Sequence, residues 1–263
     1  MLRRLVLASG SGLCNRLRAI ASARRLCARV GARCHIVWNW GQFHRFFAPL
    51  PDATLCPWGV GAASWLLERF GQRCKDQRID MSRRSAWVFT GQIIYGHDEP
   101  PVSLAALRDW LPRPSDRVAR RADEFAGQHF GNVVGMHIRR TDHGPAKTKS
   151  PDELFLETAA RLLDEGKRIF LATDNVETEQ LLRRFCGERL ITFPKAHPLV
   201  ARWPRSSFDP QACEDDLLDL LLLARTEYVV GSFFSSFSNT AMVLNGSPKC
   251  RTLNIDEPRL IAA

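Results

Sequence analysis

The chain has 263 residues, of which 45% are hydrophobic and 25% are charged, as is ordinary for a globular protein. This length suggests one large or two small domains, and it excludes a disordered chain and a disulfide-dependent mini-scaffold. The net charge of +9 favours an anionic partner, but the basic residues are spread along the chain, so we expect phosphate-bearing small molecules and no nucleic acid.

No apolar run approaches the roughly 18 residues that a membrane-spanning helix needs. The opening MLRRLVLASGSG is basic at its start, but its apolar stretch is too short for a secretory signal. The eight cysteines include no C-x-x-C pair, so we expect reduced thiols rather than a zinc ribbon. These features predict a cytoplasmic protein without a transmembrane segment, in which weak association with a membrane surface is the only membrane contact.

The N-terminal part alternates strand, glycine loop, helix and strand, which is how a Rossmann-like unit begins. Apolar residues have helical spacing between residues 15 and 30, and Gly31 is a natural helix stop. Residues 41–82 give no clear assignment. We expect strands at residues 4–8, 35–38 and 87–95, with a glycine turn at 9–12.

The second half is a regular alternation of strands and helices, which predicts a parallel sheet covered on both faces. A helix over 115–129 holds the domain boundary, so we divide the chain into residues 1–115 and 116–263. Strands are expected at 132–138, 168–173, 190–193, 227–230 and 251–255, and helices at 150–165, 177–185, 214–224 and 236–244.

Polar residues gather where these strands end, and ligands of such sheets bind beyond the carboxyl ends of the strands. The first candidate is the loop from Gly10 to Arg16, whose glycines and free backbone N–H groups suit an anion. It lacks the G-x-G-x-x-G spacing of dinucleotide-binding loops. The alternative is an ordinary glycine turn in which Asn15 caps the helix.

The second candidate is the segment His137–Asp142 after an apolar strand. Alternation along the strand directs His137 and Arg139 to one side and Arg140 to the other. Two arginines and a histidine at a strand end match the charge and geometry of a diphosphate. The alternative is a solvated cluster in which Arg140 pairs with Asp142.

Two acids and a serine-rich turn complete the set of candidates. Asp174 either accepts hydrogen bonds from a sugar or base or caps the next helix. Asp219 lies among leucines and therefore needs a partner, either a ligand or an arginine of residues 201–205. The helix start at Ser235 and Ser236 suits a phosphate, although simple capping explains these serines equally well.

Several common enzyme classes lack their signatures in this chain. There is no Asp-x-Asp pair to hold a metal ion beside a nucleotide diphosphate. There is also no P-loop and no G-x-S-x-G elbow. Arginines must therefore neutralise a leaving phosphate, and no metal or other cofactor is expected.

Taken together, these segments resemble the fucosyltransferases. GLCNRLRAIASA is similar to the opening of these enzymes, and VVGMHIRRTD resembles the H-x-R-R-T-D stretch of α1,6-fucosyltransferases and nodulation fucosyltransferases. FLATDN and DLLDLLLLARTEYVVGSFFSSFSNTA resemble their second and third motifs. The order and rough spacing also match bacterial relatives.

The resemblance implies a GT-B fold, an α/β architecture of two Rossmann-like parallel-sheet halves that face a central cleft. It also implies an inverting, metal-independent transfer of fucose from GDP-fucose to a glycan or another hydroxyl acceptor. The N-terminal half would lie on the acceptor side, and the C-terminal half would bind the nucleotide sugar. HGPAKTKS departs from the α1,6-fucosyltransferases because it has no glutamate, so no general base is identified.

Carried over by motif, the resemblance also implies residue roles. Arg139 would hold the β-phosphate with help from His137, Asp219 would read guanine, and Asn15 would lie near the scissile bond. The implied catalytic residues are Arg139 and Asn15, and the implied donor-binding residues are Gly12, His137, Arg139, Arg140, Asp174, Asp219, Ser235, Ser236, Phe237 and Ser238.

Two alternatives remain open from the sequence. The same scaffold could use a different nucleotide sugar, or it could be a nucleotide- or glycan-binding domain that has lost its chemistry. The residues that would select an acceptor fall in the unassigned stretch 41–82.

Overall fold

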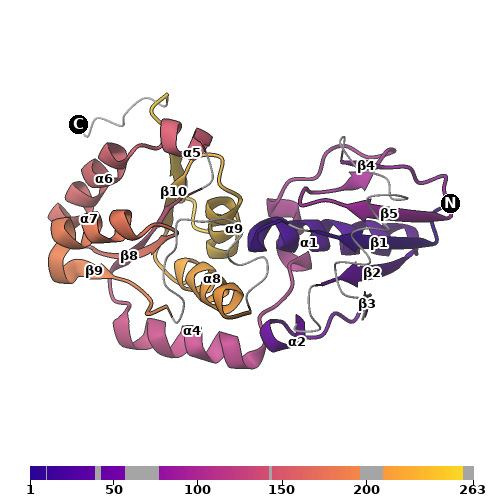
Figure 1. Ribbon diagram of the computed structural model, residues 1–263, viewed down its shortest axis with the longest axis horizontal. Helices are drawn as coiled ribbons and strands as arrows, with labels where there is room; N and C mark the ends of the chain where they lie inside the picture. Colours follow the sequence, from indigo (N-terminus) through magenta and orange to yellow (C-terminus); the bar gives the residue numbers. More distant parts are fainter. Residues whose placement is uncertain (10, 39–42, 57–76, 142–143, 196–209, 257–263) are drawn as a thin grey trace. The chain divides into compact units, whose positions relative to one another are not determined.

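The chain divides into two compact units inside one helix, between Ala119 and Arg120. Unit 1 contains residues 1–119, and unit 2 contains nearly all of the residues from 120 onward. The sequence-based boundary after residue 115 lies at the start of the same helix. Each unit is built on a parallel sheet (Figure 1). The computed structural model describes residues 1–9, 11–38, 43–56, 77–141, 144–195 and 210–256.

Unit 1 contains a four-stranded parallel sheet in the order β3-β2-β1-β5. In the central strand, Leu5 is paired with Cys34 on one side and with Ala86 on the other. Strands β4 and β6 form a separate parallel pair. The elements are β1 Arg4–Ala8, α1 Leu13–Val30, β2 Arg33–Val37, α2 Phe43–Phe46, β3 Ala53–Cys56, β4 Arg78–Ile79, β5 Ser85–Phe89, β6 Tyr95–Gly96, a 3-10 helix Ala105–Trp110 and α4 Asp116–His129.

The helix expected over residues 15–30 is confirmed, and it begins slightly earlier, at Leu13. It buries Leu17, Ile20 and Cys27, which recur at helical spacing on one side of the helix. Gly31 ends the helix in the left-handed conformation with φ of 66°, where its N–H donates to the carbonyl of Cys27. Glycine reaches this conformation without steric cost, which explains the sharp stop.

The prediction of a single strand over residues 87–95 is wrong. Strand β5 ends at Phe89, and Thr90 then accepts a hydrogen bond from the N–H of Gln92 through its hydroxyl (3.0 Å), which turns the chain. A Cβ at Gly91 would lie 2.2 Å from the hydroxyl oxygen of Ser11, so the turn packs closely on the loop after β1. Beyond the turn, Tyr95 begins β6, which pairs with β4 instead of the main sheet.

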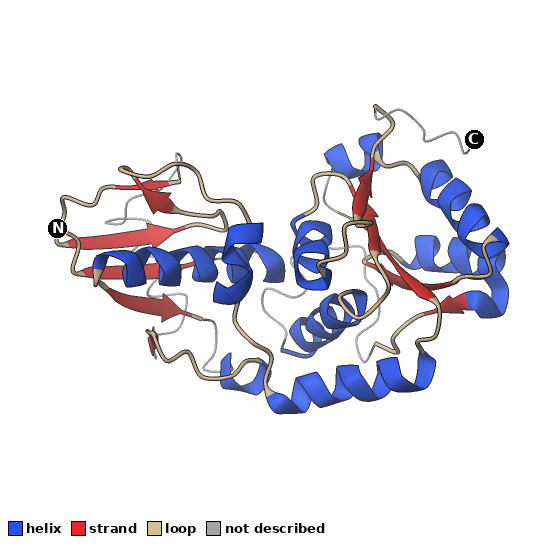
Figure 2. Ribbon diagram, turned by 180° about the vertical axis from the view of Figure 1, so that it is seen from behind, coloured by secondary structure: helices blue, strands red, loops and turns tan. Residues whose placement is uncertain are grey.

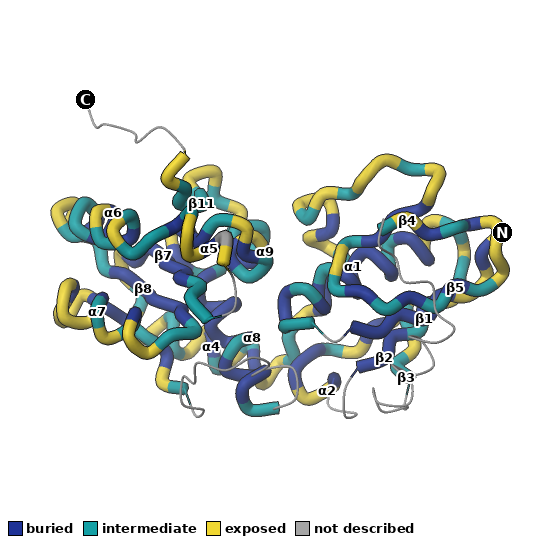
Figure 3. The backbone as a smooth tube through the Cα atoms, turned by 45° about the horizontal axis from the view of Figure 1, so that its top comes forward, coloured by how far each residue is buried: buried dark blue, intermediate teal, exposed yellow. Residues whose placement is uncertain are grey.

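Unit 2 contains a five-stranded parallel sheet in the order β11-β10-β7-β8-β9. The central strand β7 is buried along its whole length, as the tube in Figure 3 shows. A parallel strand with helices on both faces has no solvent-facing side, so a continuous apolar run is expected. The elements are β7 Val133–Ile138, α5 Gly144–Lys149, α6 Asp152–Asp164, β8 Arg168–Thr173, α7 Val176–Cys186, a 3-10 helix Gly187–Arg189, β9 Leu190–Ile191, α8 Pro210–Leu223, β10 Val229–Ser232, α9 Ser236–Asn245 and β11 Arg251–Leu253.

Alternation along β7 distributes its side chains between two layers of helices. Met136 and Ile138 belong to a core cluster with Phe155 of α6 and Leu182 of α7. His137 points to the other face, where it contacts α9. Figure 2 shows α6 and α7 on one side of the sheet and α8 and α9 on the other. The parallel sheet covered on both faces is therefore confirmed.

Two features of this unit were not expected from the sequence. Helix α5 occupies part of the HGPAKTKS segment, which has no apolar periodicity. Strand β10 also lies two residues further along than the predicted 227–230. Within the described ranges, no helix is long and apolar enough to cross a membrane.

Candidate functional site

His137 lies near the carboxyl end of β7 and is only 4% exposed. Its Nδ1 is 2.7 Å from the hydroxyl oxygen of Ser238, and its ring stacks on Phe237 with a centroid distance of 4.6 Å. Burial is the largest influence on the pKa of His137 and lowers it to about 3. The charge of Arg139 acts in the same direction. The imidazole is therefore neutral at physiological pH, and it serves as a hydrogen-bonding group rather than as a cation.

Arg139 is held by Asp174 at the carboxyl end of the next strand. The Nε of Arg139 lies 3.0 Å from Oδ2 of Asp174, and the same oxygen accepts a hydrogen bond from the hydroxyl of Thr141 (2.6 Å). The other oxygen of Asp174, Oδ1, accepts from the backbone N–H of Arg140 (2.7 Å). Burial alone raises the pKa of Asp174, but the charge of Arg139 and these hydrogen bonds lower it overall. The carboxylate therefore anchors the segment that follows β7.

The alternative that Asp174 caps the next helix is wrong. Asn175 is the cap of α7, and its Oδ1 accepts from the backbone N–H of Thr178 at 2.8 Å. Asparagine is as good a cap as aspartate, so sequence alone did not distinguish the neighbours.

Arg140 lies on the opposite side of β7 from His137, as alternation predicts. Its guanidinium donates to Oδ1 of Asp152 (2.6 Å from Nη2) and to the carbonyl of Ser150 (2.9 Å), and it lies over the ring of Phe155. The expected partner Asp142 lies outside the described residues. The observed contacts fix Arg140 to the start of α6.

The N-terminus of α9 meets this edge of the sheet directly after β10. The hydroxyl of Ser235 accepts a hydrogen bond from the N–H of Ser238 (3.4 Å), so Ser235 is the helix cap, while Ser236 is the first helical residue. The hydroxyl of Ser232 accepts from the backbone N–H of Arg139 at 3.0 Å and ties β10 to β7. A Cβ at Gly231 would lie 2.5 Å from the Cβ of Ser238, so only glycine lets α9 approach this closely.

Asp219 of α8 is 3% exposed and forms an ion pair with Lys195, whose Nζ lies 2.8 Å from Oδ2. Lys195 also donates to the carbonyl of Thr173 (2.9 Å), which connects Asp219 to the end of β8. The other oxygen, Oδ1, is buried and has no hydrogen-bond partner among the residues that the structure describes. Burial raises the pKa of Asp219 to about 6, although Lys195 acts in the opposite direction. A partner is therefore present, as expected, and it is Lys195; residues 201–205 lie outside the described ranges.

In unit 1, Gly12 precedes α1 as its cap residue, and Asn15 lies in the first turn. No side chain caps this helix, so the alternative role of Asn15 as a cap is wrong. The Oδ1 of Asn15 is buried, and no group in the described part of the chain forms a hydrogen bond with it. Its Cβ would lie 3.2 Å from a Cβ added at Gly91, so the turn after β5 fixes its position.

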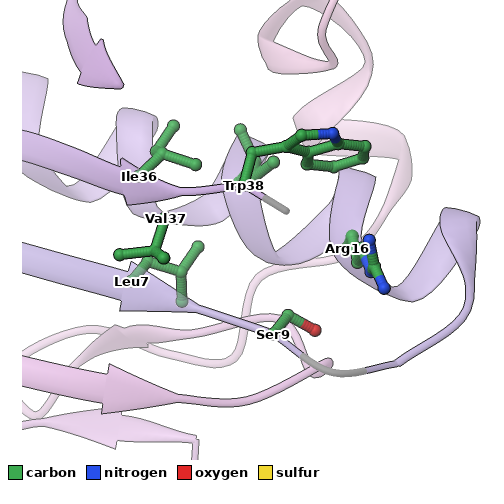
Figure 4. A pocket seen from close by; sticks show the side chains of 7 residues that line it. Leu7, Ser9, Arg16, Ile36, Val37 and Trp38 are labelled. Carbon is green, nitrogen blue, oxygen red and sulfur yellow. The ribbon is translucent and has the colours of Figure 1, made fainter. Parts of the chain in front are cut away.

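A small pocket lies at the carboxyl ends of β1 and β2 (Figure 4). Its polar lining comes from Ser9, Arg16 and Trp38. Arg16 is 5% exposed; its Nε donates to the carbonyl of Ser11 (2.6 Å), and its guanidinium lies 5.2 Å from the Trp38 ring. All of the residues that line this pocket belong to unit 1.

The structure thus gathers most of the predicted unit 2 residues at one sheet edge. Sequence reasoning missed Lys195 and Ser150, which hold the predicted residues in place. Thr141 lies in the H-x-R-R-T-D stretch, but no role of its own was predicted for it. Lys195 follows an apolar strand, which is a signal that could have indicated it, whereas Ser150 has no distinguishing pattern.

Comparisons with known proteins bear on the fold. No protein-family model matches the chain, and no curated protein matches it. The structure is similar to NodZ α1,6-fucosyltransferase soaked with GDP-fucose, with a TM-score of 0.61, 17% identity and 92% of each chain covered. A second similar structure is POFUT1 in complex with GDP, with a TM-score of 0.54, 10% identity, and 95% of this chain and 97% of that chain covered.

A third similar structure is a variant of Arabidopsis thaliana FUT1 in complex with GDP. It has a TM-score of 0.58 and 13% identity, and the match covers 96% of this chain and 70% of that one. The chain has the GT-B fold. The GT-B fold expected from the sequence motifs is therefore confirmed, and the cluster at the edge of unit 2 is the candidate functional site on it.

Proposed function

We propose that this protein is an inverting, metal-independent glycosyltransferase that transfers fucose from GDP-fucose to a hydroxyl group of a glycan or another acceptor. The observation that carries the proposal is the guanidinium of Arg139, which Asp174 holds just beyond the end of β7, close along the chain to neutral His137, whose ring contacts Ser238 in α9. Similarity to fucosyltransferases with GDP or GDP-fucose in their structures supports the choice of nucleotide.

In this proposal the diphosphate of the donor lies against Arg139 and the first backbone N–H groups of α9. As the bond from the sugar to the β-phosphate breaks, negative charge builds on GDP, and a preorganised arginine stabilises it. Asp174 keeps the guanidinium in position through Nε, so little rearrangement is needed during the reaction. His137, which is neutral, contributes a hydrogen bond and no charge.

Asp219 is proposed to bind the base. Guanine carries two neighbouring hydrogen-bond donors, N1–H and the 2-amino group. The Oδ1 of Asp219, which has no partner among the described residues, is an acceptor that such a donor would satisfy. An uncompensated buried acceptor costs about 1–3 kcal/mol, so a ligand that satisfies it gains affinity over one that does not. Asn15, in unit 1, is proposed to act near the scissile bond.

Thermal stabilisation by a panel of nucleotides tests the donor assignment. GDP and GDP-fucose should raise the Tm more than UDP or ADP, and a hundredfold excess over Kd adds about 2.7 kcal/mol of stability. Greater protection by UDP would contradict the proposal. Release of GDP from GDP-fucose with an acceptor panel then separates an enzyme from a binding domain without chemistry.

A matched pair of variants locates the site. Arg139→Ala should abolish the GDP-dependent shift in Tm, because the diphosphate loses its cation. Arg168→Ala removes an arginine from the opposite, amino end of β8, where it donates to the carbonyl of His129, and should leave that shift intact. Equal effects of the two substitutions would indicate general electrostatic attraction instead of a site.

A further inference from the structure

Phe234 combines two costly features in the turn between β10 and α9. Its backbone φ is 56°, in the left-handed region that bulky side chains avoid, and its side chain is 69% exposed. A glycine or asparagine would adopt this φ more easily. Strained residues of this kind cluster at ligand-binding sites, because the surrounding structure must hold them in place.

The surrounding structure does hold this turn from both sides. The backbone N–H of Phe233 donates to the hydroxyl of the fully buried Ser150 at 2.8 Å. On the other side, Ser235 is fixed as the cap of α9. The backbone of the turn is therefore defined by its neighbours, and the Phe234 ring lies beside that of Phe233, with a centroid distance of 6.1 Å.

The order of the strands places Phe234 at one end of the proposed donor. Asp219 is tied to the end of β8 through Lys195, Arg139 follows β7, and Phe234 follows β10. Neighbouring strands lie about 4.8 Å apart, so β8 and β10 are separated by about 10 Å. A nucleotide with its base at Asp219 and its diphosphate at Arg139 runs from β8 toward β10, and the sugar it carries reaches Phe234.

We propose that the ring of Phe234 packs against the C–H face of the pyranose that the donor carries, and thereby distinguishes a nucleotide sugar from the free nucleotide. The C–H groups of a pyranose face are apolar and slightly positive, and they complement the negative face of an aromatic ring. This inference rests on the proposed function, because it assumes a GDP-sugar on Asp219 and Arg139.

Calorimetry with GDP and GDP-fucose tests the inference. In Phe234→Ala the affinity for GDP-fucose should fall about tenfold while that for GDP stays unchanged, as expected for loss of an aromatic contact. Phe234→Gly should show the same selective loss with a Tm at or above that of the wild type, because glycine relieves the strain. Phe234→Tyr, which keeps the ring, should retain the wild-type ratio of the two affinities.

Phe185 provides a matched control, because it is a 46% exposed phenylalanine on α7 with ordinary backbone. Phe185→Ala should change neither affinity. If the Phe234→Ala and Phe234→Gly proteins keep the wild-type ratio, or if only the KM for the acceptor rises, the inference is overturned while the proposed function stands. If the wild type binds UDP better than GDP, the proposed function itself fails.

Discussion

Lowering the pH from 7 to 5 should weaken GDP binding through Asp219. The buried carboxyl has its pKa raised to about 6, so it is mostly ionised at pH 7 and mostly protonated at pH 5. Guanine presents only donors at N1 and the 2-amino group, so it requires the ionised form. Binding of GDP therefore lowers the pKa of Asp219 and releases a proton. The affinity for GDP is highest well above pH 6 and falls as the pH drops through 6.

The size of the effect follows from the same pKa. For a group with a pKa of about 6 the ionised fraction drops from about 0.9 at pH 7 to about 0.1 at pH 5, so Kd should rise about tenfold. The terminal phosphate of GDP also titrates near pH 6, so the wild type alone does not isolate Asp219.

Asp219→Asn supplies the control. The asparagine keeps the shape of the side chain but has no proton to lose, so its pH dependence reports the phosphate alone. We expect weaker GDP binding by about 1.5–3 kcal/mol at pH 7 and a smaller pH dependence than in the wild type, both measured by calorimetry. Identical pH profiles for the two proteins would refute the reasoning, since Asp219 would then not contact the base.

Three further results are expected. Arg139→Lys keeps the charge but loses the planar guanidinium with its paired donors, so kcat should fall about 10²-fold or more. A variant with near wild-type turnover would show that Arg139 has only a structural role. Treatment with EDTA should leave GDP binding and turnover unchanged; activity that disappears and returns with manganese would contradict metal independence. Gly231→Ala should lower both Tm and GDP affinity, because the added methyl would lie 2.5 Å from the Cβ of Ser238; an unchanged Tm would show that α9 is free to shift.

The parts of the fold that sequence predicts well are those in which local pattern and burial agree. Strand β8 was expected at residues 168–173 and has these bounds, because an apolar run between a glycine stop and an Asp-Asn turn leaves little choice. The stop at Gly31 follows from capping chemistry in the same way.

Tertiary contacts explain where the pattern fails. Residues 90–95 look like a continuation of β5, but Ile94 turns away because its N–H donates to the buried hydroxyl of Ser22 at 3.0 Å. That contact joins residues far apart in sequence, so no local rule contains it. The site shows the same limit: Asp174 and Asp219 were recognised as important, but their partners Arg139 and Lys195 are set by the packing of separate strands and helices.

Ser150 links the end of the chain to the turn that carries Phe234. Its hydroxyl donates to the carbonyl of Leu253 in β11 at 2.5 Å and accepts from the N–H of Phe233. These bonds join residues 103 and 83 positions apart, so they close large loops, and such contacts form late in folding. A chain that stops before residue 251 would therefore retain the motifs but would lack the carbonyl of Leu253, to which the Ser150 hydroxyl donates while it accepts from Phe233.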